Sequence, residues 1–172
     1  AALCRLLAPA SATLSSSTGV YGEQGARCVS AESPALPVSA RERRLAEIET
    51  CWRAMPEASV VRLAGLYGPG RVVGLAGLRA GAPVPGDPDG WLNLIHATDA
   101  ARLLLRVARD RAADVELGAD GTPVTRRIYY QTLAAWLGVA PPRFSGESAQ
   151  RGGGSRRCDP RSTRERLQWQ PM

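Results

Sequence analysis

The sequence predicts an α/β fold in which helices cover a parallel sheet. Short apolar runs of strand length alternate along the chain with helical patterns, which is typical of parallel strands joined by crossover helices. The chain has 172 residues, 44% of them hydrophobic, which is enough for one core and a small appendage. No segment recurs at a period of about 20 to 50 residues, so a solenoid is excluded.

The first half of the chain alternates strand, loop and helix. Leu45, Ile48 and Trp52 recur at helical spacing and define the buried face of one predicted helix, which Pro56 ends. The predicted elements are a strand 12–17, a Gly-containing loop 18–22, a Pro-rich connector 23–37, a helix 39–55, a strand 60–64 and a loop 65–70.

Shorter elements follow in the second half. Leu103, Leu104 and Val107 give another helix its buried stripe, and Tyr129, Tyr130, Leu133 and Trp136 are helically spaced core or interface residues. The predicted elements are an irregular segment 71–90, a strand 91–95, a helix 100–108, a strand 115–117, a helix 122–137, a basic low-complexity segment 145–157 and a short helix from 162.

Residue type predicts where these helices begin and end. Thr98 or Asp99 can cap the helix 100–108, and Thr122, followed by a proline, can cap the next one. Ser162 starts a capping-box pattern, and Gly138 is a C-terminal stop signal.

Charge and hydropathy exclude several classes of protein. The net charge is +6 and every one of the 22 basic residues is arginine, but apart from 41–44 and 151–166 they are scattered and lack interleaved aromatic residues, so we expect no nucleic-acid partner. No apolar stretch is long enough to cross a bilayer. The opening residues 1–12 resemble a signal peptide only weakly, because Arg5 interrupts them, so a cytoplasmic location is expected.

The four cysteines do not form a recognisable site. Cys4, Cys28, Cys51 and Cys158 lie far apart, and there is one histidine in the sequence. A structural zinc site needs closely spaced ligand pairs, so the spacing predicts reduced thiols and no metal.

Four segments, in the same order and at familiar distances, resemble the NAD-dependent epimerase/dehydratase family of extended short-chain dehydrogenases. Ser15–Gly22 is similar to the signature SSxxVYG at a strand end, and Val61–Arg71 to a strand and loop ending in YGPG. Asn93–Asp99 resembles the helix entry IHVxD, and Ser155 through Pro171 the terminal KR and LGWxP pattern. The match covers most of the chain and looks most like an atypical, sugar-nucleotide-epimerase-like branch.

The resemblance implies the C-terminal part of a Rossmann-type parallel sheet with helices, plus a small mixed substrate domain. Residues 1–70 would belong to the NAD(P)-binding domain and 71–172 mostly to the substrate-binding domain, with 91–118 returning to the sheet. The implied cofactor is NAD or NADP, and the implied partner is a small nucleotide-sugar-like substrate. The resemblance is also compatible with a homodimer.

The family's first βαβ unit, whose Gly-rich turn holds the cofactor pyrophosphate, has no counterpart in this sequence. Gly152–Gly154 is no substitute, because no apolar strand precedes it and no apolar helix follows. We interpret the sequence as an N-terminally truncated chain, whether by an internal start, a shortened gene or fragmentation.

The resemblance also places a catalytic triad that this sequence alters. Ser17 matches the family's Ser/Thr, but Ser39 stands at the tyrosine of the Y-x-x-x-K motif and Arg43 at its lysine. A spacing of four puts both side chains on one helix face, where an ammonium can lower the pKa of a phenol that acts as base. Serine is a poorer base and arginine stays protonated, so the standard relay is missing. Ser39 is more readily explained as a helix N-cap, and Arg43 as either a cofactor-binding cation or a solvated residue.

The remaining candidates are weighed in the same way. Ala64, Gly65 and Leu66 match the segment that passes the nicotinamide, where small residues allow close backbone approach. Arg71 can meet a substrate diphosphate or be a solvated loop residue, and His96 fits a structural role better than acid–base work or substrate binding.

Two classes of function follow. In the first, the protein is an epimerase/dehydratase-like enzyme with an altered base. In the second, it is a non-catalytic NAD(P)-binding or structural protein, or a fragment that does not act alone. If the chain is such a fragment, the exposed edge strand of its incomplete sheet would be an aggregation hazard.

Overall fold

The computed structural model describes residues 11–110, 115–146 and 155–172. The signal-like opening with Cys4, and the glycines 152–154, lie outside these ranges. The described cysteines, Cys28, Cys51 and Cys158, are free thiols, as expected. No helix in the described ranges is both long and apolar enough to span a bilayer.

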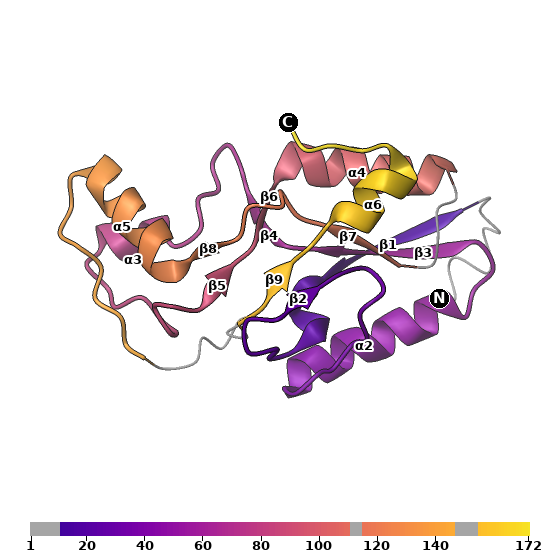
Figure 1. Ribbon diagram of the computed structural model, residues 1–172, viewed down its shortest axis with the longest axis horizontal. Coiled ribbons are helices and arrows are strands. Elements are labelled where there is room, and N and C mark those ends of the chain that lie inside the picture. Colours follow the sequence, from indigo (N-terminus) through magenta and orange to yellow (C-terminus); the bar gives the residue numbers. More distant parts are fainter. Residues whose placement is uncertain (1–10, 111–114, 147–154) are drawn as a thin grey trace.

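A three-stranded parallel sheet forms the centre of the molecule (Figure 1). Its strand order is β1 (Ala12–Ser17), β3 (Ala58–Leu63) and β7 (Val115–Gly118). Helix α2 (Ala40–Arg53) packs against one face and α4 (Ala97–Asp110) against the other. The predicted parallel, helix-covered sheet is therefore confirmed, and its central strand β3 is buried from Ser59 to Leu63.

Two further pairs of short strands follow along the chain. Strands β4 (Gly65–Tyr67) and β6 (Leu94–His96) pair in parallel, whereas β5 (Trp91–Leu92) and β8 (Val124–Thr125) pair antiparallel. Helices α3 (Leu75–Arg79) and α5 (Arg126–Leu137) pack together at the end of the molecule remote from the three-stranded sheet (Figure 1). A separate hydrophobic cluster lies there, made of Leu78, Val84, Tyr130, Leu133 and Ala134.

The C-terminal segment returns to the main sheet. The 3-10 helix η1 (Thr18–Tyr21) follows β1, and β2 (Cys28–Val29) pairs in parallel with β9 (Arg157–Cys158). Helix α6 (Arg161–Leu167) then packs near β7 and α4. Leu167 and Trp169 join the main hydrophobic core with residues of β3, α4 and β7.

The buried face of α2 differs from the prediction. Leu45 and Trp52 are partly buried, but Ile48 is 45% exposed and Glu49 is only 3% exposed. Glu49 occupies the core-facing position because it pairs with Arg62 of β3, with 2.8 Å between Oε2 and Nη2. The ion pair therefore fixes the rotation of the helix, which apolar spacing alone could not indicate.

Several predicted boundaries are wrong for a common reason. The segments 65–70 and 71–90 are not irregular throughout, since they contain β4 and α3, and the strand 91–95 divides into β5 and β6. The connector 23–37 contains β2. These short elements form only because partners distant in sequence supply their contacts.

Three of the predicted caps are also wrong. Helix α5 begins at Arg126 with Thr125, not Thr122, as its N-cap, and α6 begins after Pro160, not Ser162. Helix α4 begins at Ala97, so neither Thr98 nor Asp99 caps it. The carboxylate of Asp99 is buried and accepts hydrogen bonds from Arg102 and the backbone N–H of Met172. Gly138 is the C-cap of α5 as predicted, with φ +64°, while Trp136 is 82% exposed and outside the core.

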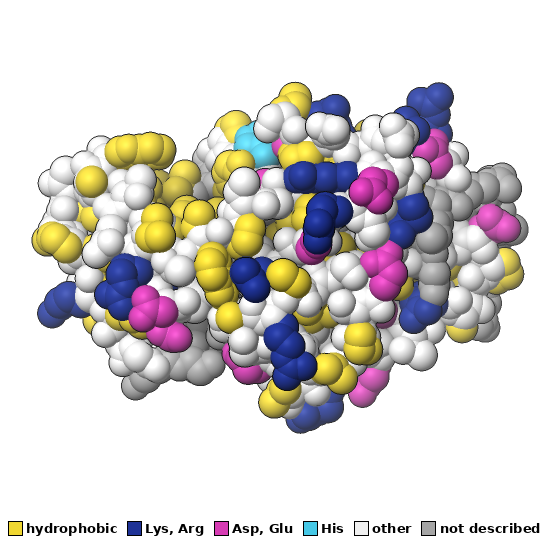
Figure 2. Space-filling model, viewed as in Figure 1, with side chains coloured by type: hydrophobic (Ala, Val, Ile, Leu, Met, Phe, Trp, Pro, Cys, Tyr) yellow, Lys and Arg dark blue, Asp and Glu magenta, His cyan; other side chains and the backbone are white. Residues whose placement is uncertain are grey.

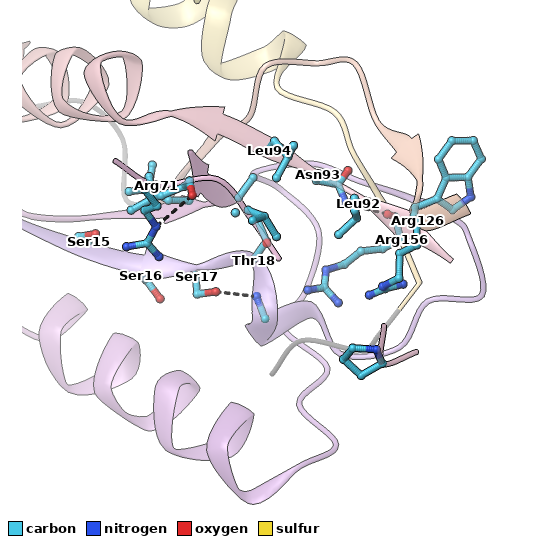
Figure 3. A pocket seen from close by; sticks show the side chains of 18 of the residues that line it. Ser15, Ser16, Ser17, Thr18, Arg71, Leu92, Asn93, Leu94, Arg126 and Arg156 are labelled. Atoms are coloured by element: carbon cyan, nitrogen blue, oxygen red, sulfur yellow. Dashed lines mark hydrogen bonds between the residues drawn. The ribbon is translucent and has the colours of Figure 1, made fainter. Parts of the chain in front are cut away.

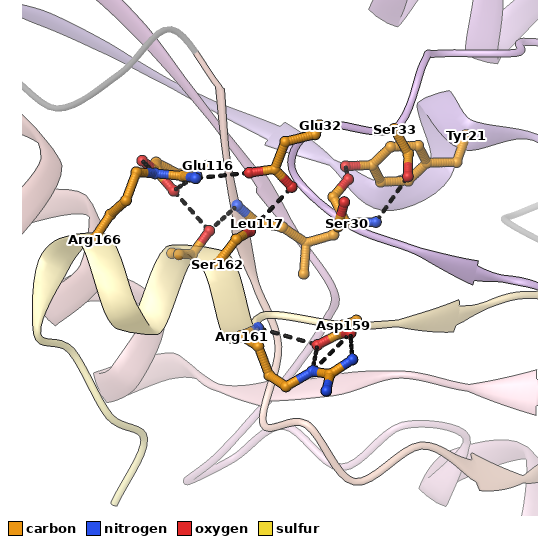
Figure 4. Close-up of polar contacts among 11 residues, drawn as sticks. Tyr21, Ser30, Glu32, Ser33, Glu116, Leu117, Asp159, Arg161, Ser162 and Arg166 are labelled. Atoms are coloured by element: carbon orange, nitrogen blue, oxygen red, sulfur yellow. Dashed lines mark hydrogen bonds and ion pairs between the residues drawn. The ribbon is translucent and has the colours of Figure 1, made fainter.

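A polar network fastens α6 to the sheet (Figure 4). Glu116 of β7 is fully buried and accepts from Nε and Nη2 of Arg166 at 3.1 and 2.8 Å, and from the hydroxyl of Thr163 at 2.6 Å. Arg166 also donates to Glu32 at 2.6 Å, and Ser162 donates to the same carboxylate at 3.0 Å. These donors satisfy the hydrogen-bonding capacity of the buried Glu116 carboxylate.

The Glu32 contacts predict a pH dependence of stability. The Arg166 side chain lowers the pKa of Glu32 to about 2, below its usual value of 4.5. Because the folded-state pKa is depressed, the stabilisation is complete above the unfolded pKa and is lost as the pH falls through the folded pKa. We therefore expect Glu32→Gln to be less stable than the wild type at pH 7, and the difference to vanish as the pH falls from about 5 to 2. Urea unfolding across this range checks it, and a difference independent of pH would contradict it.

Candidate functional site

A cavity of about 670 Å³ opens at the carboxyl ends of β1 and β3 (Figure 3). Ser17 and Gly65 both line it, as do residues from α2, β5, α5 and the segment before β9. In α/β sheets the crevice beyond the carboxyl ends of parallel strands is the usual ligand site. Ser17, which matches the family's Ser/Thr, and Gly65, from the segment that matches the nicotinamide wall, therefore line one crevice.

Ser17 ends β1 and begins η1 as its N-cap. Its Oγ accepts a hydrogen bond from the backbone N–H of Gly19 at 3.1 Å. A hydroxyl that accepts in this way keeps its own hydrogen for a second partner. Ser17 is thus held at the edge of the cavity with a donor that a bound ligand can use.

The segment Ala64–Leu66 connects β3 to β4 and forms the adjoining wall. The N–H of Ala64 donates to the carbonyl of Gly118, and that of Gly65 to the carbonyl of Asn93, both at 2.9 Å. A Cβ on Gly65 would lie 3.1 Å from both the Asn93 oxygen and Leu94 Cδ2. Glycine therefore allows the backbone to approach its neighbours closely here.

The cavity lining is strongly cationic. Arg41, Arg71, Arg126 and Arg156 all line it, whereas no aspartate or glutamate does among the described residues. Arg71 donates from Nε to the carbonyl of Leu66 at 3.1 Å, while Arg126 and Arg156 are each only 5% exposed. Elsewhere on the face seen in Figure 2, basic and acidic side chains are interspersed. The cavity therefore suits an anionic ligand.

The chain was compared with known proteins by sequence and by structure. No protein-family model matches the chain. Protein YeeZ of Escherichia coli K12 is 38% identical over 134 residues, which are 75% of this chain and 47% of YeeZ. The chain thus spans about half the length of the curated relatives it matches.

Solved structures share the fold over nearly the whole chain. A conserved protein of unknown function from Silicibacter pomeroyi is 26% identical, with a TM-score of 0.77, over 91% of this chain and 59% of its own. The dTDP-glucose 4,6-dehydratase of Bacillus anthracis, solved in complex with NAD, is 17% identical, with a TM-score of 0.82. The match covers 99% of this chain and 59% of the dehydratase. The chain has the fold of the extended short-chain dehydrogenases. The resemblance stated from the motifs is confirmed at the level of the fold.

Ser39 and Arg43, which stand at the tyrosine and lysine of the family's motif, do not lie in the cavity. The hydroxyl of Ser39 accepts from the N–H of Glu42 at 3.2 Å, and the Glu42 carboxylate accepts from the N–H of Ser39 at 2.8 Å, which is a complete capping box. Arg43 donates to the carbonyl of Val38. Neither residue lines the cavity, and Arg41 is the α2 cation that does.

His96 and Tyr21, the tyrosine of the VYG segment, both have partners within the protein. His96 accepts at Nδ1 from the N–H of Thr98 at 3.3 Å and packs edge-on against Tyr67, outside the cavity lining. Tyr21 is fully buried, donates to the carbonyl of Ser30 at 2.7 Å, and has its pKa raised to about 12 by burial. Neither is placed to exchange a proton with a ligand in the cavity.

Sequence reasoning missed three of the four cavity arginines. Arg41, Arg126 and Arg156 come from segments separated by tens of residues. Arg156 lies in the segment that resembles the terminal KR pattern, but that pattern gave it no ligand, and nothing in the local sequence distinguishes Arg41 or Arg126. The chain contains 22 arginines, so only their meeting in space shows which ones face a ligand.

Proposed function

We propose that this chain carries the substrate-side catalytic crevice of an NAD(P)-dependent epimerase/dehydratase-like protein that acts on a nucleotide sugar. The observation that carries the proposal is that Ser17, the segment Ala64–Leu66 and four arginines line one cavity at the carboxyl edge of the sheet. In this proposal, residues 1–70 belong to the NAD(P)-binding domain and 71–172 mostly to the substrate domain, with 91–118 returning to the sheet.

The roles follow from the geometry of the cavity walls. Ala64, Gly65 and Leu66 offer a close backbone surface for the nicotinamide, whose chemistry when bound would be hydride exchange with a sugar carbon. Ser17 donates its hydroxyl hydrogen to the oxygen carried by the sugar carbon that is oxidised or reduced. Arg71 and the other arginines attract the phosphate groups of the substrate.

The replacement of the family's tyrosine and lysine by Ser39 and Arg43 favours a second candidate function. Ser39 and Arg43 are engaged in helix capping and a backbone contact, so they do not supply the relay. A protein that keeps the crevice without a base would bind NAD(P) and a nucleotide sugar without turnover. This second candidate is a non-catalytic binding protein.

Titration separates these functions. NAD, NADP and UDP-glucose are titrated calorimetrically into this chain and into a version extended upstream along the gene, and turnover of UDP-glucose and dTDP-glucose is followed by product analysis. Binding with turnover supports the enzyme, and binding without turnover supports the non-catalytic protein. Failure of both proteins to bind either dinucleotide rejects the proposal.

In whichever version turns over a nucleotide sugar, Ser17→Ala is expected to lower kcat about 100-fold, because it removes a positioned hydrogen-bond donor at the reacting oxygen. Ser39→Ala is the matched control, since its hydroxyl caps α2 outside the cavity. It should reduce stability by about 1 kcal/mol and leave kcat unchanged. Equal losses of kcat in both variants would contradict the role of Ser17.

A further inference from the structure

Asn93 is the single residue between β5 and β6, and it is the only asparagine in the sequence. It lines the cavity between Leu92 and Leu94 (Figure 3). Strand β5 pairs antiparallel with β8, whereas β6 pairs in parallel with β4. The chain therefore changes strand partner at Asn93, inside the cavity wall.

The main chain of Asn93 is attached to the segment assigned above to the nicotinamide wall. Its carbonyl accepts a hydrogen bond from the N–H of Gly65 at 2.9 Å. A Cβ on Gly65 would lie 3.1 Å from the same oxygen, so the two backbones are in close contact. The next carbonyl, that of Leu94, accepts from the N–H of Asp120 at 2.8 Å. Backbone hydrogen bonds therefore set the position of Asn93 relative to the segment 64–66.

The side chain of Asn93 is attached to a different part of the chain. Its Nδ2 donates to the carbonyl of Arg156 at 2.9 Å, and its Oδ1 accepts from the N–H of Cys158 at 2.7 Å. Because a carbonyl needs a donor and an N–H needs an acceptor, these two partners fix the orientation of the amide. One side chain thus satisfies two backbone groups of a segment that begins 63 residues later.

These two backbone groups lie on one edge of β9. In an extended segment, successive residues direct their N–H and C=O groups to opposite edges. On the other edge, the N–H of Arg157 donates to the carbonyl of Arg27 at 2.9 Å. The N–H of Asp159 likewise donates to the carbonyl of Val29 at 2.8 Å. Within the described ranges β2 is the strand that pairs with β9, so the Asn93 amide takes the place of a neighbouring strand on the second edge.

We propose that Asn93 is a positioning residue, which fixes the Arg156 wall of the cavity relative to the wall formed by Ala64–Leu66. Both walls line the same cavity, and both are attached to Asn93, one through its carbonyl and the other through its side chain. A ligand that spans the cavity needs both walls in register, because displacing a supporting group by about 1 Å is enough to impair a site. The inference rests on the proposed function for the identity of that ligand, a nucleotide sugar.

Asn93→Leu tests this role, because it keeps the backbone carbonyl and removes both side-chain hydrogen bonds. By amide hydrogen exchange followed by NMR, we expect the N–H of Cys158 to exchange at least about tenfold faster than in the wild type. The N–H of Gly65 should stay protected, since its acceptor is retained. UDP-glucose, titrated calorimetrically into whichever version of the protein binds it, should bind the variant at least about tenfold more weakly.

Gln24→Leu serves as the control. The amide of Gln24 donates to the carbonyl of Tyr21 at 2.6 Å, within its own turn, and Gln24 does not line the cavity. Its removal also leaves a buried carbonyl without that donor, so a comparable loss of stability is expected. Cys158 exchange and UDP-glucose affinity should nevertheless stay within about twofold of the wild type. Equal losses of affinity in the two variants would indicate a general effect of lost stability and overturn the positioning role.

Asn93→Asp replaces Asn93→Leu if the latter does not fold. It keeps an acceptor for the N–H of Cys158 but loses the donor to the carbonyl of Arg156, so protected Cys158 exchange and weakened UDP-glucose binding are expected. Unchanged Cys158 exchange in Asn93→Leu, or wild-type affinity for UDP-glucose in either variant, overturns the inference. If the wild type binds no UDP-glucose but Cys158 exchange still depends on Asn93, the proposed function alone is rejected.

Discussion

Glu49→Ala is expected to destabilise the protein by about 3–5 kcal/mol, because it leaves the Arg62 guanidinium buried without its counter-ion. Both side chains are about 5% exposed or less, and Arg62 Nε and Nη2 donate to Glu49 at 3.1 and 2.8 Å. The hydroxyl of Ser16 loses its acceptor as well, since it donates to Glu49 at 2.5 Å. Urea-induced unfolding followed by circular dichroism measures the change in the free energy of unfolding.

Glu47→Ala provides the control on the same helix. Glu47 is exposed, two residues from Glu49, and its removal changes the helix composition and net charge in the same way. We expect a change within about 0.5 kcal/mol for this variant. Equal unfolding midpoints for the two variants would show that the buried ion pair does not fix α2 on the sheet.

Gly22→Ala is the second variant with a large expected effect. Gly22 has φ +64°, a left-handed conformation that alanine adopts at a cost of about 1–2 kcal/mol. A Cβ here would also lie 2.1 Å from the carbonyl oxygen of Leu36, which is backbone and cannot move aside easily. Such overpacking adds about 1–3 kcal/mol. Because the Gly22 carbonyl accepts from Arg156, a shift of this turn should also displace the Arg156 side chain in the cavity.

Gly25→Ala separates the two causes. Gly25 has φ +54°, but nothing lies within 4 Å of the position its Cβ would take. It should therefore show only the conformational cost of about 1–2 kcal/mol. The difference between the two variants in urea unfolding reports the clash with Leu36, and no difference would contradict it.

The sequence alone determined the elements whose patterns are local. Strands β1, β3 and β7 are where the apolar runs predicted them, and α2 begins at the Ser39 cap and α5 ends at Gly138. The order of these elements was sufficient to predict a parallel sheet, and the family resemblance pointed to Ser17 and Gly65, which line one crevice. These features follow from side-chain periodicity, capping chemistry and the handedness of crossover connections, which neighbouring residues specify.

Only the tertiary structure decided which polar residues face the core and the ligand. Glu49 rather than Ile48 is buried on α2 because its partner Arg62 lies in β3, and β4 is a strand because β6 pairs with it. Arg126 and Arg156 meet in the cavity through strand pairings that no local pattern encodes. The energy of pairing two distant segments depends on where the chain folds back on itself, and the spacing of residues along the sequence does not specify this.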